Sequence, residues 1–153
     1  MKWVITMYDL MIIGAGPGGI FTALETIRLN PDCSIAVLEA GAPLHERKCP
    51  IDGKKVKSCI HCKPCSIMNG FGGAGAFSDG KYNITNEFGG TLHEYIGADT
   101  AMELMEYVDS INCRYGAAQT KLYENSDPTI AKKCLQHNLH LLKANVRHLG
   151  TDI

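Results

Sequence analysis

The chain has 153 residues, of which 45% are hydrophobic and 20% charged, so it can bury a core and lacks the composition of a disordered chain. Its formal net charge of −1 argues against a nucleic-acid partner, because such binders carry a basic face that neutralises phosphates. No apolar run reaches the roughly 18 residues that span a membrane, and polar residues interrupt the first ten positions, where a secretory signal would be apolar. We therefore expect a globular protein of the cytoplasm with no membrane span.

The first predicted elements are a strand, a helix and a second strand. Residues 8–13 are mostly apolar and end directly at a glycine, as a central parallel strand does. Residues 34–39 read as the next strand. Between them, residues 17–29 carry apolar side chains at helical spacing, namely Ile20, Ala23, Leu24 and Ile27. The sequence thus predicts a βαβ unit and an α/β fold.

Two further helices and a strand are predicted in the second half of the chain. Residues 100–112 have a helical pattern whose apolar side consists of Met102, Met105, Val108 and Ile111. Asp127 followed by Pro128 predicts an N-cap and a helix that continues to about residue 137. Residues 139–149 resemble a strand.

A glycine motif lies between the first strand and the helix, where residues 14–19 read Gly-Ala-Gly-Pro-Gly-Gly and match G-x-G-x-x-G. Gly14 would make the tight turn, Gly16 would let the backbone approach a pyrophosphate, and Gly19 would let the helix pack on the strand. The unpaired N–H groups at the start of a helix favour an anion. Pro17 suits this first turn because it has no N–H that needs a partner.

An acidic residue, Glu39, ends the second predicted strand. A carboxylate at this position can accept hydrogen bonds from both ribose hydroxyls of an adenosine and would repel a 2′-phosphate. Strand, glycine turn, helix, strand and acid together predict a dinucleotide site. The motif by itself leaves FAD and NAD open, because both contain ADP.

A long ordered loop region is predicted over residues 41–90, where regular periodicity is lost and glycine and cysteine dominate. Within it, residues 70–80 are rich in glycine and have no bulky aliphatic side chain. The backbone there can come close to a phosphate or a ring and offer its N–H groups. Asn83 and Thr85 would add side-chain hydrogen bonds.

Two segments resemble known flavoproteins. Residues 8–41 resemble the N-terminal segment of the two-dinucleotide-binding-domain flavoproteins. Residues 70–81, Gly-Phe-Gly-Gly-Ala-Gly-Ala-Phe-Ser-Asp-Gly-Lys, closely resemble a family of incompletely characterised FAD-dependent dehydrogenases. Residues 81–86 are also similar to the R-x-N-x-T-N loop of a wider flavoprotein clan. The resemblance implies a Rossmann-like FAD-binding fold and an FAD-dependent oxidoreductase that transfers electrons or hydride through the flavin.

The resemblance also implies which residues surround the FAD. The first glycine motif would bind pyrophosphate, the acid at the end of the second strand would bind ribose, and the second glycine stretch would lie at the flavin. The expected cofactor-binding residues are Gly14, Gly16, Pro17, Gly18, Gly19, Glu39, Ala40, Arg47, Lys48, Gly72, Gly73, Ala74, Gly75, Ser78 and Lys81.

Four of the seven cysteines lie close together in the sequence, at Cys49, Cys59, Cys62 and Cys65. The C-x-x-C-x-x-C spacing with a distant Cys-Pro resembles part of the ligand set of a 4Fe-4S cluster. A zinc site, a redox-active dithiol and plain reduced thiols stay open as alternatives. Lysines surround the cluster and would offset thiolate charge. The remaining cysteines, Cys33, Cys113 and Cys134, are expected to be ordinary core or surface thiols.

No catalytic residue can be assigned from the sequence. The six histidines lack ligand spacing, and no nucleophile–base pair is recognisable. The acidic residues of the helix over 100–112 and its first turn are explained by a solvated face; they are Asp99, Glu103, Glu106 and Asp109.

We expect residues 1–90 to form the N-terminal part of an FAD-binding domain and residues 91–153 to begin a substrate-side α+β region. The family is several hundred residues long, so the resemblance implies that a C-terminal part of the same polypeptide completes the FAD site. The partner would be a small-molecule substrate or a redox protein. The alternatives are an NAD-binding dehydrogenase and a non-catalytic, zinc-stabilised nucleotide-binding adaptor.

Overall fold

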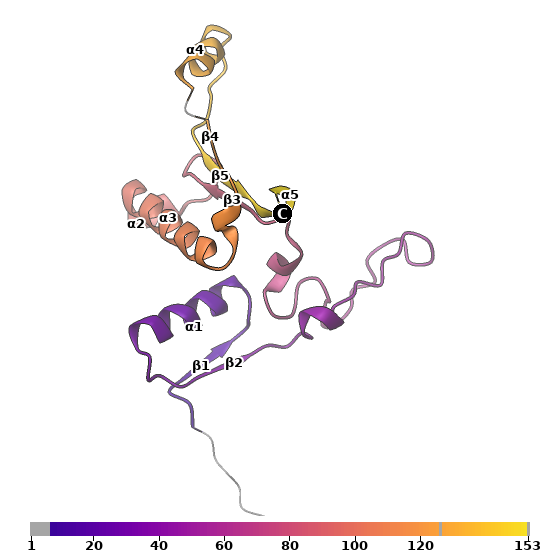
Figure 1. Ribbon diagram of the computed structural model, residues 1–153. Coiled ribbons are helices and arrows are strands. Elements are labelled where there is room, and N and C mark those ends of the chain that lie inside the picture. The colour runs from indigo at the N-terminus through magenta and orange to yellow at the C-terminus, as the bar shows by residue number, and fades with distance from the viewer. Residues whose placement is uncertain (1–6, 126, 153) are drawn as a thin grey trace, which may run out of the picture. The chain divides into compact units, whose positions relative to one another are not determined.

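The computed structural model describes residues 7–125 and 127–152, and the chain divides into two compact units, Met1–Ser78 and Asp79–Ile153 (Figure 1). Helices and short strands are mixed in both, which agrees with the predicted α/β class in its general form. The predicted domain boundary after residue 90 stays a prediction. In the described ranges, no helix has the length and apolar character needed to cross a membrane. The first six residues, on which the expectation about a secretory signal partly rests, lie outside the described residues.

The first unit begins with the predicted βαβ arrangement. Strands β1 (Leu10–Ile13) and β2 (Ile35–Leu38) pair in parallel, and helix α1 (Pro17–Leu29) connects them (Figure 1). Ile12 is buried. A Cβ at Gly19 would lie 3.3 Å from the Ile12 side chain and 2.0 Å from the Gly14 carbonyl oxygen, so α1 and β1 approach each other closely only because residue 19 is glycine.

The other face of this two-stranded sheet is open in the described structure. Met11 and Ile13 point away from α1 and are 57% and 86% exposed. Leu38, paired with Ile13 across the strands, is 50% exposed. Parallel strands are normally covered on both faces, so this apolar face lacks the cover that such a sheet requires.

The rest of the first unit is irregular, as predicted. Between β2 and the end of the unit, the described chain forms only two short 3₁₀ helices, η1 (Leu44–Glu46) and η2 (Gly73–Phe77). The irregular backbone is organised by side chains that bond to it. Asp52, for example, accepts hydrogen bonds from the N–H groups of the three residues 54–56 at 2.8–2.9 Å, which closes a tight turn.

The second unit contains a three-stranded antiparallel sheet in the order β3-β5-β4. The strands are β3 (Lys81–Ile84), β4 (Leu122–Glu124) and β5 (Asn145–His148). Strand β5 lies within the strand predicted over 139–149. Strand β3 falls inside the region predicted as loop, because its four residues follow a glycine stretch and are too few to show periodicity.

Helices complete the second unit. The predicted helix over 100–112 is confirmed as α3 (Ala98–Arg114), and the predicted N-capped helix is confirmed as α4 (Pro128–Gln136). The Asp127 carboxylate accepts the Thr129 N–H at 2.8 Å, as an N-cap should. The short elements that the sequence did not predict are α2 (Leu92–Ile96), η3 (Ala117–Gln119) and α5 (Leu149–Asp152).

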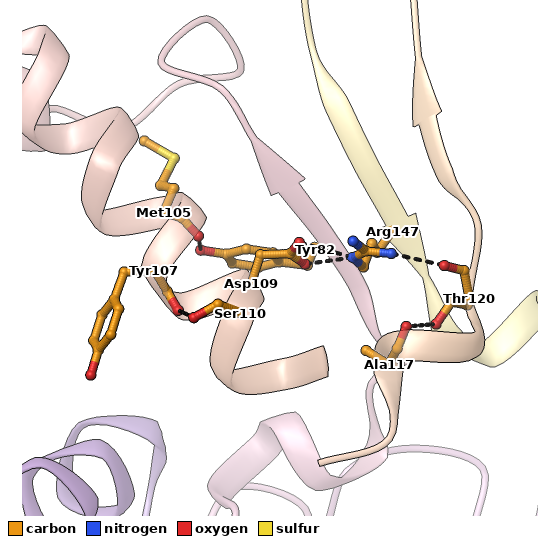
Figure 2. A network of polar contacts seen from close by, with 8 residues as sticks. All are labelled: Tyr82, Met105, Tyr107, Asp109, Ser110, Ala117, Thr120 and Arg147. Atoms are coloured by element: carbon orange, nitrogen blue, oxygen red, sulfur yellow. Dashed lines mark hydrogen bonds and ion pairs between the residues drawn. The ribbon is translucent and has the colours of Figure 1, made fainter. Parts of the chain in front are cut away.

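The expectation that Asp109 belongs to a solvated helix face is wrong. Asp109 is 9% exposed, and both of its carboxylate oxygens accept the Arg147 Nε–H, at 2.7 and 2.9 Å (Figure 2). Arg147 also donates to the Thr120 carbonyl oxygen at 2.8 Å, so one guanidinium joins α3, β5 and the segment after η3. The Tyr82 hydroxyl donates to the Met105 carbonyl beside this pair, and burial together with Asp109 raises the pKa of Tyr82.

We predict that Asp109→Asn destabilises the chain by about 3 kcal/mol, because removing one partner of a buried pair leaves the other charge uncompensated. Urea unfolding followed by circular dichroism measures this loss. Glu106→Gln, an exposed acid less than one turn away on the same helix, is the control and should change stability by less than about 0.5 kcal/mol. Equal effects of the two substitutions would contradict a structural role for the Asp109–Arg147 pair.

Candidate functional site

The first glycine loop opens onto free space at the start of α1. Gly14 has φ +99°, a conformation that favours glycine, and its N–H donates to the Leu38 carbonyl oxygen at 2.7 Å. Added Cβ atoms at Gly14, Gly16 and Gly18 would meet no atom within 4 Å. No protein atom therefore fills the space next to these three glycines.

The N-terminus of α1 has no side-chain cap. Gly16 is the N-cap residue, Pro17 occupies the first turn, and no side chain bonds to the cap. The first intrahelical bond runs from the Ile20 N–H to the Gly16 carbonyl, so the N–H groups of Gly18 and Gly19 precede the helical ladder. Donors at this end of a helix attract an anion.

Glu39 connects the first glycine loop to two other segments. Its Oε2 accepts the Ala15 N–H at 2.7 Å, and its Oε1 accepts the N–H groups of Gly41 and Gly70 at 2.8 Å each. These three hydrogen bonds hold the pKa of the Glu39 carboxyl below its ordinary value, the Ala15 bond having the largest effect. A carboxylate offers about four acceptor positions, so Glu39 has room for roughly one more donor and not for both ribose hydroxyls.

The second glycine stretch packs directly on the first. The Gly72 N–H donates to the Ala15 carbonyl oxygen at 2.7 Å. A Cβ at Gly73 would lie 3.5 Å from Gly16 Cα and 3.7 Å from Pro17 Cδ. Two segments that are more than fifty positions apart in the sequence are thus in direct contact.

Arg47 stabilises the second glycine stretch by donating hydrogen bonds to its carbonyl oxygens. Its side chain is only 6% exposed and donates to carbonyl oxygens of Ser66, Ile67, Phe71 and Gly73, at 2.6–3.0 Å. The guanidinium also lies 4.7 Å from the centre of the Phe77 ring. These contacts occupy Arg47 inside the protein. The structure therefore gives Arg47 a supporting position, whereas the resemblance implied contact with the cofactor.

The remaining predicted cofactor residues are found mainly at the surface. Ala40, Lys48, Ala74, Gly75 and Ser78 are exposed in the first unit. Lys81 begins β3 and belongs to the second unit, as do Asn83 and Thr85. The Thr85 hydroxyl donates to the Lys143 carbonyl oxygen at 2.8 Å, so it is used within the second unit.

The four clustered cysteines line one cavity of about 280 Å³. Its other lining residues are Pro50, Ile51, Ile60, His61, Lys63 and Ser66. All four thiols are free, Cys59 is exposed and the others are half-buried. Among the described residues, no three His, Cys, Asp or Glu side chains converge tightly enough to hold a single metal ion.

Cys65 differs from its neighbours in its electrostatic surroundings. Hydrogen bonds from the Met68 and Ile67 N–H groups, together with the positive charge of Arg47, lower the pKa of the Cys65 thiol. The same Arg47 that binds the carbonyls after Cys65 therefore also favours its thiolate.

Sequence reasoning missed the structural work of Glu39 and Arg47. Glu39 was assigned to the ribose because it ends the second predicted strand, and Arg47 was assigned to the cofactor through the resemblance. A signal was present, because an irregular loop region must satisfy its backbone N–H and C=O groups with side chains when no ladder does so.

Comparison with known proteins gives no match: no protein-family model, no curated protein and no solved structure matches this chain.

We predict that Glu39→Gln lowers the melting temperature by a few degrees at neutral pH. The glutamine NH₂ would face a backbone N–H whose acceptor in the native protein is a carboxylate oxygen. The Glu39 pKa is depressed in the folded state, so its stabilisation is present above the unfolded pKa and is lost as pH falls through the folded one. The difference between the two proteins should therefore shrink below the ordinary carboxyl pKa. Melting curves between neutral and acidic pH test this, with the exposed Glu103→Gln as control; a pH-independent difference would contradict it.

We predict that Arg47→Lys destabilises the chain by about 3 kcal/mol, since an ammonium keeps the charge but cannot reach all the carbonyls that the guanidinium fork binds. Hydrogen exchange should show loss of protection over residues 66–73. The reverse exchange at the next position, Lys48→Arg, is exposed and serves as the matched control. If Arg47→Lys left the free energy of unfolding unchanged, the positive charge alone would be enough to hold residues 66–73.

Proposed function

We propose that this chain is the FAD-binding part of a flavin-dependent oxidoreductase with a Rossmann-like nucleotide fold. The observation that carries the proposal is the meeting of the two glycine loops, joined by the Gly72–Ala15 hydrogen bond and by the Glu39 carboxylate. The first loop has open backbone at Gly14, Gly16 and Gly18, and the second loop lies beside it at Gly73, so together they suit an elongated ligand rather than a single anion.

The first loop suits a pyrophosphate. The uncapped N–H groups of Gly18 and Gly19 and the dipole of α1 supply donors and positive potential. The open space at Gly16 allows close approach of phosphate oxygens.

Glu39 suits a ribose, with a change from the sequence-based expectation. Its Oε2 accepts one N–H and can accept one hydroxyl more. The second ribose hydroxyl would need another partner or would displace a backbone N–H from Glu39.

The second loop suits the flavin end of FAD. Gly73 lies against Gly16 and Pro17, and the exposed Ala74 and Gly75 follow it, so a ligand bound at the first loop would extend along this segment. A bound flavin would supply hydride or single-electron chemistry, and the protein would position it and keep its surroundings fixed through Arg47. If the ligand were NAD, the first loop alone would bind it in the simplest arrangement. The second loop would then have no role.

Further polypeptide is part of this proposal. The open face formed by Met11, Ile13 and Leu38 is the face that a larger parallel sheet would cover. We propose that additional chain of the same protein covers it and completes the flavin site, and that a small-molecule substrate or a redox protein exchanges electrons there.

The test is FAD binding by the purified chain and by its Gly16→Ala variant. Gly16 has φ −74° and a free Cβ direction, so alanine fits the fold but places a methyl group in the space assigned to pyrophosphate. We expect unchanged thermal stability and an FAD affinity at least about tenfold lower, which corresponds to about 1.4 kcal/mol. Isothermal titration calorimetry measures it.

The matched control is Thr22→Ala, an exposed residue of α1 six positions after Gly16, which should leave FAD affinity unchanged. Gly19→Ala should instead destabilise the fold, because its Cβ would lie 2.0 Å from the Gly14 carbonyl oxygen. Binding of NAD but not FAD would replace the flavin proposal with a nicotinamide one. Binding of neither would reject a dinucleotide site in this chain.

A further inference from the structure

The cavity lined by Cys49, Cys59, Cys62 and Cys65 is not accounted for by FAD binding. It brings together all four cysteines of one sequence cluster and none of the other three in the chain. Pro50, Ile51 and Ile60 supply an apolar part of its wall. A grouping of this kind, with several soft sulfur ligands around one space, is suited to zinc or to an iron–sulfur cluster.

The four cysteines line one cavity, but within the described residues they do not form the site of a single metal ion. Tetrahedral zinc holds four sulfurs at about 2.3 Å from one centre, which brings them nearly into contact with one another. Among the described residues, no three potential ligands converge in that way, although the four cysteines share a cavity of about 280 Å³. In a cubane cluster each thiolate binds a different iron, so the sulfurs stand farther apart around a larger body.

A backbone N–H group is directed at one of the four sulfurs. The His61 N–H donates to Cys59 Sγ at 3.4 Å, and His61 holds φ +55°, a left-handed conformation unusual for a residue with a side chain. Such N–H···S bonds stabilise thiolate ligands, and they are among the features that tune iron–sulfur centres.

The segment that carries the four cysteines is rich in positive charge. The segment from 47 to 66 contains one carboxylate, on Asp52, and six cationic side chains, those of Arg47, Lys48, Lys54, Lys55, Lys57 and Lys63. Four thiolates around a cluster carry net negative charge, which these cations offset. Of these cations, Lys63 is among the residues that line the cavity.

We propose that Cys49, Cys59, Cys62 and Cys65 bind a [4Fe–4S] cluster in this cavity. On insertion each thiol loses its proton to solvent and its sulfur binds one iron, with no change in oxidation state. The bound cluster takes up and releases one electron at a time. The inference does not depend on FAD binding, although a one-electron centre beside a flavin site would suit the proposed oxidoreductase.

The test is anaerobic assembly of the cluster on the whole chain in the absence of FAD. Ferrous and ferric iron are supplied in equal amounts with sulfide, so that the core forms without another oxidant. After desalting we expect about four iron and four sulfide per chain, and a broad visible absorption that bleaches when dithionite adds one electron. The reduced sample should give an electron paramagnetic resonance signal.

Variants decide which residues bind. Cys62→Ser and Cys49→Ser should each lose most of the iron, whereas Cys33→Ser and Cys134→Ser, which lie outside the cavity, should keep it. Circular dichroism of the iron-free variants shows whether each remains folded, and FAD titration of the same samples gives a second readout. Full iron retention by Cys49→Ser or Cys62→Ser overturns the ligand assignment.

The failure of this inference can be told apart from the failure of the proposed function. One zinc per chain, taken up in parallel trials and accompanied by no retained iron and sulfide, overturns the cluster and leaves the FAD proposal intact. If the chain binds neither the iron–sulfur cluster nor zinc and its FAD affinity is unchanged, the cluster proposal is overturned as well. Bound iron and sulfide in a chain that does not bind FAD supports the cluster and rejects the proposed function.

Discussion

The carboxylate of Glu39 is the interaction on which the organisation of the first unit depends. It accepts N–H groups from the first glycine loop, from the turn after β2 and from the start of the second glycine stretch. Gly41 lies so close to residues 69 and 70 that a Cβ there would be 2.3 Å from the Gly70 nitrogen. Hydrogen bonds and close backbone contact thus act at the same point, and the loops are positioned although no strand or helix holds them.

Arg47 is the counterpart of Glu39 on the other side of the second glycine stretch. Glu39 accepts from backbone N–H groups and Arg47 donates to backbone carbonyls, so the two side chains satisfy opposite needs of the same irregular chain. Arg47 binds the carbonyls of residues just after Cys65 and of the glycine stretch itself. Arg47 therefore links the wall of the cysteine cavity to the second glycine stretch, although we propose different ligands for the two.

Regular elements were predictable where the sequence is periodic or capped. The bounds of α1 and the N-cap at Asp127 follow from local spacing and local hydrogen bonding. Asp109 was misjudged because its partner, Arg147, lies 38 positions away and a helical pattern shows only which face is polar. The glycine loops were recognised as loops, but their contact depends on backbone bonds of Glu39 and Arg47 to residues far along the chain, and the irregular pattern does not say which side chains make them. The short strand β3 had too few residues to show a period.

The Glu39 and Arg47 side chains are only eight positions apart, and this fixes how the chain can vary in length. A residue inserted or deleted in 40–46 would move Glu39 relative to Arg47. The second glycine stretch could then keep its hydrogen bonds to only one of these two side chains. The exposed turn at 52–55 is under no such restriction, because Asp52 bonds only to residues within it and to its end. Length variation among relatives should therefore accumulate in that turn and be absent between Glu39 and Arg47.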